Sequence, residues 1–377
     1  MTFLQQAVHH PRKLWLRKAV FQVHLWAGLL LTLYIVVIAL TGSILVFEDE
    51  LTGTTLPAAI ARDGARDPLP IPDVVTNVLR AYPEATVESV TVPTRDVPAY
   101  LIEAKLRAGR VQTMIADPAT GTIYTQKRTW VQWVHDLHIY LLLNPAYGMQ
   151  VNAAGAAVLL LLAVTGLMLW WPGLRVWSRG MRVNLRANWR RMNYDLHSAI
   201  GFWTLLLVFW WALSGVYFGF YRQVSAAVNA VFPLRNMVAP AGGAVASPAT
   251  RVPLATVLQA AQDASPHAHL FSISNVSRVD DISYASMDLG APGDFLHRDI
   301  VRIDATSGRV ISVWHYAEKH SIGDWVMWLM HPLHFGTLWG MGVKILWAVL
   351  GVLLGVLAVS GVVMYWNRAL RHMLRRA

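Results

Sequence analysis

Long uncharged apolar segments alternate with polar segments along the chain. The four apolar segments without a charged residue are 25–47, 151–171, 198–221 and 345–366. Each contains at least 21 residues, and a helix needs about 20 apolar residues to cross a bilayer. The pattern therefore predicts a polytopic α-helical membrane protein with four transmembrane helices.

The predicted transmembrane helices divide the chain into segments. We expect these helices at residues 20–47, 151–172, 197–221 and 343–366. The polar segments at 48–128 and 222–323 are each followed by a short histidine-bearing helix, at 129–150 and 324–342. The remaining segments are a basic arm at 1–19, a basic loop at 173–196 and a tail at 367–377.

Both polar segments show the order of a small α+β domain. Residues 72–81 and 253–263 predict short helices. The predicted strands are 85–92, 99–106, 111–116 and 122–125 in the first segment and 269–276, 282–289 and 299–303 in the second. A turn of the D-x-x-T-G type occurs in each, at 117–121 and 304–308, and residues 239–248 predict a flexible linker.

Histidine motifs recur at matched places in the two halves of the chain. The matched pairs are His24 and His197, Gly28 and Gly201, His135 and His331, and His138 and His334. The offset is 173 residues at His24 and 196 at His138, so the extra residues lie in the polar segments. The recurrence predicts two parallel, pseudo-symmetric repeats, in which matched residues share one depth in the membrane.

Four pairs of small residues recur with the histidines. They are Thr41-Gly42, Thr165-Gly166, Ser214-Gly215 and Ser360-Gly361. Small residues allow membrane helices to approach closely. We expect helix contacts at these pairs and assign them no chemistry.

Basic residues are sorted by segment. The formal net charge is +10, but residues 1–19, 173–196 and 367–377 together hold fourteen Arg and Lys against one acidic residue, Asp195. Positive charge marks the cytoplasmic side of membrane proteins. We therefore expect a bacterial inner-membrane protein with both termini cytoplasmic and two periplasmic domains. The charge is explained by topology, so the expected partner is the lipid bilayer and no nucleic acid.

The absence of cysteine limits the cofactor chemistry. The chain has 0 Cys, which excludes disulfides, iron–sulfur clusters, thiolate metal sites and covalent attachment of haem through C-x-x-C-H. Any redox cofactor must be bound non-covalently by His or Met.

The chain resembles the PepSY-associated transmembrane proteins in its Leu-His motifs, in TGLMLWWP at 165–172 and in PLHFG at 332–336. The two polar segments resemble PepSY domains, and the resemblance covers about residues 18–368. Within this family the length and layout are similar to the FoxB-type ferric-siderophore reductases. That resemblance implies a di-haem protein that reduces iron at the periplasmic side. Larger relatives carry a fused flavin domain, which this sequence does not predict.

The first matched histidines suit a haem. A b-type haem takes two axial imidazoles on opposite faces, and His24 and His197 share one depth near the cytoplasmic ends of their helices. Gly28 and Gly201 follow one turn deeper and leave room for a flat macrocycle. The alternative is that both histidines cap helix starts at the membrane interface while the glycines serve helix packing.

The second matched histidines suit a second haem near the periplasmic face. We assign His138 and His334 because the Leu-His motif carries the family resemblance. His135 and His331 lie one helical turn earlier on a similar face. They are alternative ligands, or partners of a haem propionate or of the substrate.

The remaining histidines suggest no site. His267, His269, His297, His315 and His320 in the second polar segment are interpreted as surface residues, and His9, His10 and His372 belong to the basic arms. We find no phosphate-binding loop, hydrolase triad or H-E-x-x-H motif, and assign no catalytic side chain.

We expect an oxidoreductase with two haem b groups whose irons are bound by His24, His197, His138 and His334. Electrons would pass from a quinol or a cytoplasmic reductase to a ferric siderophore or another ferric chelate, for iron acquisition. A metal or siderophore permease that uses the histidines as a transit path is the main alternative. A signalling or anchoring protein is a third possibility.

Overall fold

The computed structural model describes residues 15–60, 68–106, 111–125, 127–171, 178, 180–235, 251–277, 282–290, 293 and 296–370. The predicted linker and His9, His10 and His372 lie outside the described residues. The chain forms two compact units. The helical unit takes its residues from Met1–Phe47, Trp133–Ala227 and Leu329–Ala377, and the sheet unit takes Glu48–Gln132 and Val228–Trp328.

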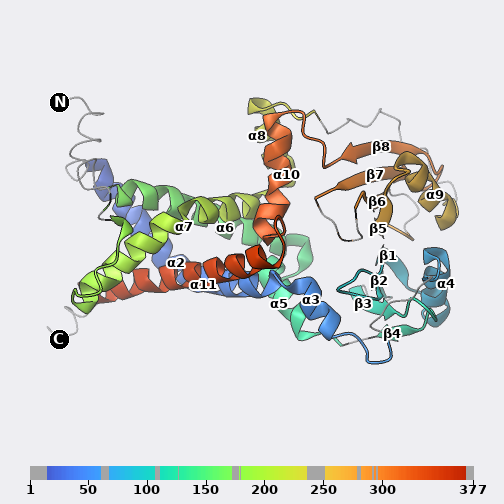
Figure 1. Ribbon diagram of the computed structural model, residues 1–377, viewed down its shortest axis with the longest axis horizontal. Helices are drawn as coiled ribbons and strands as arrows, with labels where there is room; N and C mark the ends of the chain where they lie inside the picture. The colour runs from blue at the N-terminus through green and yellow to red at the C-terminus, as the bar shows by residue number, and fades with distance from the viewer. Residues whose placement is uncertain are drawn as a thin grey trace. The chain divides into compact units, whose positions relative to one another are not determined.

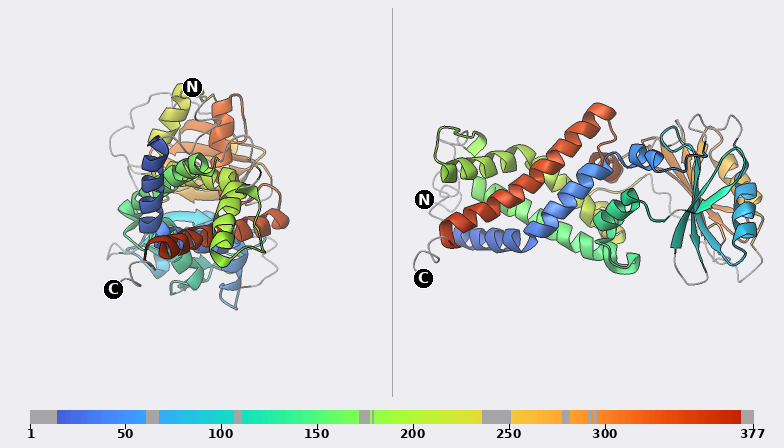
Figure 2. Two further views of the ribbon diagram at one scale, coloured as in Figure 1. Left: turned by 90° about the vertical axis from the view of Figure 1, so that its left-hand side faces the viewer. Right: turned by 90° about the horizontal axis from the view of Figure 1, so that it is seen from below.

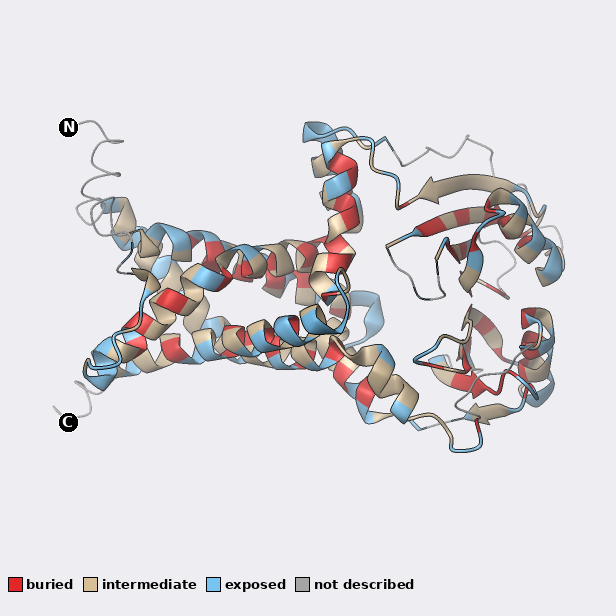
Figure 3. Cartoon of the chain, viewed as in Figure 1, coloured by how far each residue is buried: buried red, intermediate tan, exposed pale blue. Residues whose placement is uncertain are grey.

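Four long helices dominate the helical unit (Figure 1). They are α2 (Trp15–Leu45), α6 (Pro145–Trp170), α7 (Trp189–Gly219) and α11 (Met341–Tyr365). Each is long and apolar enough to cross a membrane, and no more than 33% of the apolar stretch of any of them is buried within the protein. The remaining apolar surface requires lipid as its solvent (Figure 3). The chain is therefore a polytopic helical membrane protein.

The helices begin before the uncharged segments that predicted them. Asparagine N-caps explain two of these starts, because each cap satisfies a free backbone N–H. The side chain of Asn144 accepts a hydrogen bond from Ala146 N at the start of α6, and Asn188 accepts one from Arg191 N at the start of α7. Helical structure thus continues past the charge-free stretch, which marks only the part inside hydrocarbon.

The four helices pack as a ring. Helix α2 contacts α6 and α11, and α7 contacts the same two helices, so α2 and α7 occupy opposite corners. Small residues bring α6 and α7 together. A β-carbon at Gly215 would lie 2.9 Å from Ala156 Cβ, and one at Gly219 would overlap Ala153 and lie 2.9 Å from the carbonyl oxygen of Met149. This close approach is typical of membrane helix interfaces.

Short helices flank the long ones along the chain. They are α3 (Glu48–Thr54), α5 (Trp130–Tyr140), α8 (Tyr221–Val231), α10 (Ile322–Phe335) and the π-helical turn η3 (Trp366–Leu370). Helix α5 ends where Leu141 and Leu142 adopt positive φ angles of 55° and 57°. The segment predicted as one helix at 129–150 is therefore divided between α5 and the first turns of α6. Similarly, the segment at 324–342 divides between α10 and the start of α11.

The sheet unit contains one antiparallel sheet of eight strands in the order β4-β3-β2-β1-β5-β6-β7-β8. The strands are β1 (Thr86–Thr91), β2 (Tyr100–Lys105), β3 (Val111–Ala116), β4 (Ile123–Thr125), β5 (His269–Ser274), β6 (Ile282–Asp288), β7 (Arg298–Asp304) and β8 (Val310–His315). Helices α4 (Ile71–Ala81) and α9 (Leu254–Ala264) cover the same face (Figure 2). Their apolar residues and those of the strands form one core.

The two polar segments therefore do not form two separate domains as predicted. Strand β1 pairs with β5, with Val90 opposite Ile273, and this pairing joins the segments into a continuous sheet. The physical reason is that each segment alone would expose an unpaired strand edge, whereas pairing satisfies the backbone of both. Strand β8 was not predicted.

The structure contains both turns of the D-x-x-T-G type, the second of which has Ser307 in the place of threonine. Asp117 Oδ1 accepts hydrogen bonds from the backbone of Ala119 and Thr120, and Asp304 Oδ1 accepts one from Thr306 N. The glycines that close the turns, Gly121 and Gly308, have φ angles of 69° and 72°. Glycine is favoured at such positions because it lacks a β-carbon.

Substitution of Gly219 by leucine should destabilise the helical unit. The added side chain must displace Ala153 or the backbone of Met149, and overpacking of this kind costs about 1–3 kcal/mol. Thermal unfolding in detergent should show a lower midpoint than that of the native protein. The control is Gly342→Leu, because a β-carbon at Gly342 meets nothing within 4 Å. Equal midpoints for both variants would contradict the packing described for α6 and α7.

Candidate functional site

His24 and His197 line one cavity inside the helix ring. His24 comes from α2 and His197 from α7, the helices at opposite corners. The cavity has a volume of about 1260 Å³, which exceeds the roughly 300–1,000 Å³ usual for a drug-sized ligand. The arrangement provides a pair of imidazoles and space for a large apolar group.

Basic side chains and glycines complete the lining of the cavity. Arg17, Lys18, Arg190 and Arg368 are among the lining residues, as are Gly28 and Gly201. A β-carbon at Gly28 would meet only Leu162, at 3.9 Å, and one at Gly201 would meet only Leu357, at 3.7 Å. The helices could therefore carry side chains at these two places. Their lack of side chains enlarges the cavity.

Each of these histidines is oriented by a hydroxyl group on a neighbouring helix. His24 Nδ1 lies 2.9 Å from Thr165 Oγ1, and His197 Nδ1 lies 2.9 Å from Ser360 Oγ. The glycine that follows each hydroxyl residue leaves space for the imidazole ring. A β-carbon at Gly166 would lie 3.3 Å from His24 Cε1, and one at Gly361 would lie 3.4 Å from His197 Cε1. Because Nδ1 is engaged in both rings, Nε2 is the nitrogen left for a ligand bond.

His138 on α5 and His334 on α10 form a second pair, with ring centres 6.4 Å apart. Their Nδ1 atoms lie 3.0 Å from Thr41 Oγ1 and 2.7 Å from Ser214 Oγ. Burial, together with the charge of neighbouring histidines, lowers the pKa of His138 to about 4 and that of His334 to about 3. Both imidazoles are therefore neutral near pH 7, which is the form that binds a metal.

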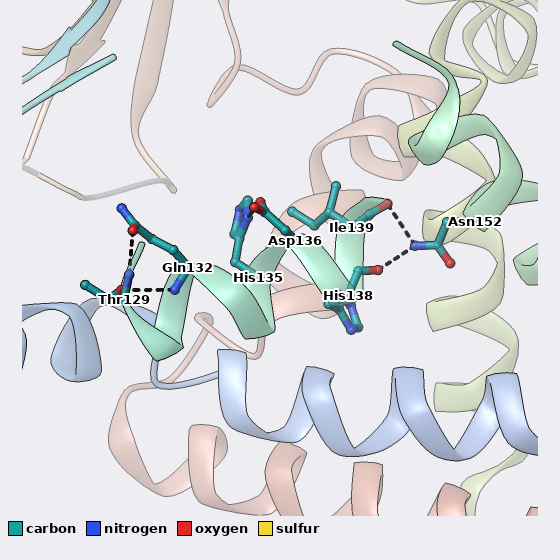
Figure 4. A network of polar contacts seen from close by, with 7 residues as sticks. All are labelled: Thr129, Gln132, His135, Asp136, His138, Ile139 and Asn152. Carbon is teal, nitrogen blue, oxygen red and sulfur yellow. Dashed lines mark hydrogen bonds and ion pairs between the residues drawn. The ribbon is translucent and has the colours of Figure 1, made fainter. Parts of the chain in front are cut away.

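The end of α5 that carries His138 is held by Asn152 of α6 (Figure 4). Asn152 Nδ2 donates to the carbonyl oxygens of His138, at 2.6 Å, and Ile139, at 3.2 Å. Tyr34 in turn donates its hydroxyl proton to Asn152 Oδ1 at 2.8 Å. These bonds satisfy carbonyls that the end of a helix leaves free. Trp347 of α11 holds the end of α10 in the same way, because its Nε1 donates to Leu333 O at 2.7 Å.

His135 and His331 have different surroundings. His135 Nδ1 lies 3.2 Å from Asp136 Oδ1 on the same helix, and both side chains are about one-third exposed (Figure 4). The ring of His331 packs against Phe218 at 4.9 Å and Phe335 at 6.2 Å. The structure thus brings the rings of His138 and His334 together as a half-buried pair, and it places His135 and His331 in other surroundings. The ligand assignment itself stays a prediction.

Four hydroxyl residues have a role that the small-residue pattern does not predict. The pattern predicts only helix contacts, yet each of these residues holds the Nδ1 atom of a candidate ligand: Thr41, Thr165, Ser214 and Ser360. A signal was present, because a hydroxyl residue precedes glycine in all four pairs. Groups that accept a hydrogen bond from the second ring nitrogen commonly fix the orientation of metal-binding histidines.

The other histidines of the sheet unit lie at its surface or beside carboxylates. His267, His269, His297 and His320 are exposed. His315 Nδ1 pairs with Asp299 at 3.0 Å and His320 Nε2 with Glu318 at 3.0 Å. Within the part of the chain that the structure describes, no group of three or more His, Asp or Glu side chains could hold a metal ion.

Comparison with known protein families identifies the class of the chain. The family described as PepSY-associated TM region matches residues 21–368. The match covers most of the 377 residues, and the chain belongs to this family. The family resemblance inferred from the Leu-His motifs is therefore confirmed. No curated protein matches the chain.

Replacing Asn152 with leucine should lower the stability of the helical unit. The change leaves the carbonyls of His138 and Ile139 without this donor, whereas the hydroxyl of Tyr34 keeps the backbone carbonyl oxygen of residue 152 at 3.0 Å. Buried polar groups that lose a hydrogen bond cost about 1–3 kcal/mol. Thermal unfolding in detergent should therefore begin at a lower temperature. Tyr34→Phe removes the hydroxyl and should cost less, so an effect as large as that of Asn152→Leu would argue against this role.

Proposed function

We propose that the protein is a di-haem inner-membrane reductase, of the FoxB type within its family, that transfers electrons across the membrane to a ferric chelate. His24 and His197 would bind one haem iron, and His138 and His334 the other. The observation that carries the proposal is the geometry of the second pair. Two neutral imidazoles from different helices stand with ring centres 6.4 Å apart, and each has its Nδ1 atom engaged.

This geometry fits a metal bound between two histidines. A metal–imidazole bond is about 2 Å long, so two rings on opposite sides of one metal have centres roughly 6 Å apart. A haem would be held by one imidazole from each member of such a pair. At the first pair, the cavity of about 1260 Å³ has room for the macrocycle beside Gly28 and Gly201. Arg190 and Arg368 at the same cavity suit its negatively charged propionates, whereas Arg17 donates to the carbonyl oxygens of Met168 and Trp171 at the end of α6.

Haem b, when bound, supplies one-electron redox chemistry at its iron. The chain's own residues would hold and orient it and keep the surroundings apolar. Thr41, which contacts His138, lies 17 residues after His24 on α2, and 17 residues of α-helix span roughly 25 Å. The hydrocarbon core of a bilayer is about 30 Å thick. The two sites therefore lie at levels that suit electron transfer from one side of a membrane to the other.

The substrate we propose is a ferric siderophore or another ferric chelate at the periplasmic side. The donor at the opposite side would be a quinol or a cytoplasmic reductase. One electron converts Fe³⁺ to Fe²⁺, which hard oxygen ligands bind less tightly, so reduction releases the ion. The membrane potential favours the outward movement of an electron by roughly 2.3 kcal/mol per 100 mV, because the outer side is positive. The reaction requires no general acid or base from the protein.

The basic residues at the cavity support the proposed orientation. Arg17, Arg190 and Arg368 come from three separate segments and line the same cavity. This agrees with placing the arm, the middle loop and the tail together on the cytoplasmic side. The sheet unit would then be periplasmic.

The purified protein should be coloured and should contain two b-type haems. Haem content per chain and the dithionite-reduced absorption spectrum measure this. His24→Ala and His334→Ala should each remove about half of the haem, because each change removes a ligand from one site only. His297→Ala, at an exposed position, serves as the control and should retain both.

Two results would contradict the reductase. A colourless preparation would exclude it and favour the metal permease, whose histidines need no haem. Loss of both haems, or of neither, in each single variant would contradict the assignment to two independent sites. Ferrous iron production from a ferric chelate by proteoliposomes with an internal reductant then tests the activity directly.

Single cysteines should report the orientation, because the native chain contains none. Ser178 and Thr125 are both exposed. In spheroplasts, a membrane-impermeant maleimide should label Thr125→Cys, whereas Ser178→Cys should react only after permeabilisation. The reverse pattern would overturn the proposed topology.

A further inference from the structure

We propose that Thr41, Thr165, Ser214 and Ser360 are positioning residues that set the reduction potentials of the two haem irons. Each would act through the histidine that it contacts. This inference rests on the proposed function, because the histidines must bind haem for it to apply. It goes further by assigning to four hydroxyl groups a role in tuning the iron.

The hydroxyl protons are already donated within the helices. Thr165 Oγ1 donates to Leu161 O at 2.7 Å, and Thr41 Oγ1 donates to Val37 O at 2.7 Å. The serines do the same. Ser214 Oγ donates to Trp210 O and Ser360 Oγ to Leu357 O, each at 2.7 Å.

The protonation of each imidazole follows from this arrangement. A hydroxyl group has one proton and two lone pairs. Since the backbone carbonyl takes the proton, the hydroxyl oxygen can only accept from the histidine. Nδ1 must then carry the hydrogen, and Nε2 keeps the lone pair that binds iron. All four histidines are thus prepared as ligands through the same atom.

The hydrogen bond from Nδ1–H to the hydroxyl oxygen also changes how strongly the imidazole binds iron. Donation from Nδ1 raises the basicity of Nε2. A more basic imidazole stabilises ferric iron more than ferrous iron and lowers the reduction potential. Removing the hydroxyl should therefore raise the potential. A role restricted to helix packing would not produce this shift.

The contacts assign the hydroxyl groups to the two sites separately. Thr165 and Ser360 serve the pair His24 and His197, whereas Thr41 and Ser214 serve His138 and His334. A change at one hydroxyl should thus affect only one of the two haems. This separation gives the inference a specific signature.

Redox titration of the purified holoprotein, followed in the α-band, tests this. Thr165→Val keeps the shape of the side chain and removes the hydroxyl. At a fixed solution potential, the reduced-to-oxidised ratio of one haem should rise about tenfold, which corresponds to 59 mV for one electron. The other haem should keep its potential. Thr41→Val should shift the second haem and spare the first, and Thr165→Ser and Thr41→Ser should restore native values.

The control is Ser43→Ala, because Ser43 donates its hydroxyl to Ala39 O at 2.8 Å within α2, in the same way as the four positioning residues do within their helices. It should leave both potentials unchanged. Loss of a single haem in Thr165→Val, restored in Thr165→Ser, would also support the inference, since removing the hydrogen-bond partner of a ligating histidine weakens metal binding by about 10–100-fold. If Thr165→Val does not fold, Thr165→Ala removes the same hydroxyl and tests the same contact with His24.

Three results would overturn the inference: native potentials in the valine variants, equal shifts of both haems, or shifts that the serine variants do not reverse. These results differ from failure of the proposed function, which would appear as a native protein without haem.

Discussion

A buried imidazole in a membrane requires polar partners from the protein itself, because the bilayer core contains no water. The backbone of a transmembrane helix is already hydrogen-bonded along its own length. Serine and threonine hydroxyls are polar groups that remain available between helices. In this protein four of them engage four histidines, and each bond joins two different helices. The same interaction therefore orients a candidate ligand and connects the helices that carry it.

This constraint also explains the duplicated arrangement. Helix α2 carries His24 together with Thr41, and α7 carries His197 together with Ser214, so each of these helices takes part in both sites. Hydrogen bonds between membrane helices contribute about 0.6 to 2 kcal/mol each, and four of them favour one arrangement of the bundle. Asn152 and Trp347, which are 195 residues apart, both donate to carbonyls at the end of a histidine-bearing helix. This correspondence supports the two-repeat interpretation. It also shows that two different side chains, an amide and an indole, can donate to the carbonyls at the end of such a helix.

Local patterns predicted most elements, but not their long-range contacts. Uncharged apolar runs located the four long helices, and alternation located seven of the eight strands, because both signals lie within a few neighbouring residues. The β1–β5 pairing depends on two strand edges meeting in space. Likewise, the partners in the histidine–hydroxyl contacts are between 97 and 163 residues apart in the sequence. Spacing identified the histidines as a matched set, but only the fold shows which hydroxyl reaches which ring.

The number of haems bound by the native protein tests the central claim most directly. Pyridine haemochrome analysis, normalised to protein concentration, gives this number without any substitution. The account predicts two b-type haems per chain, both reduced by dithionite. One haem per chain would contradict the assignment of two haem sites. A haem-free, folded protein would contradict the whole account of the histidine pairs.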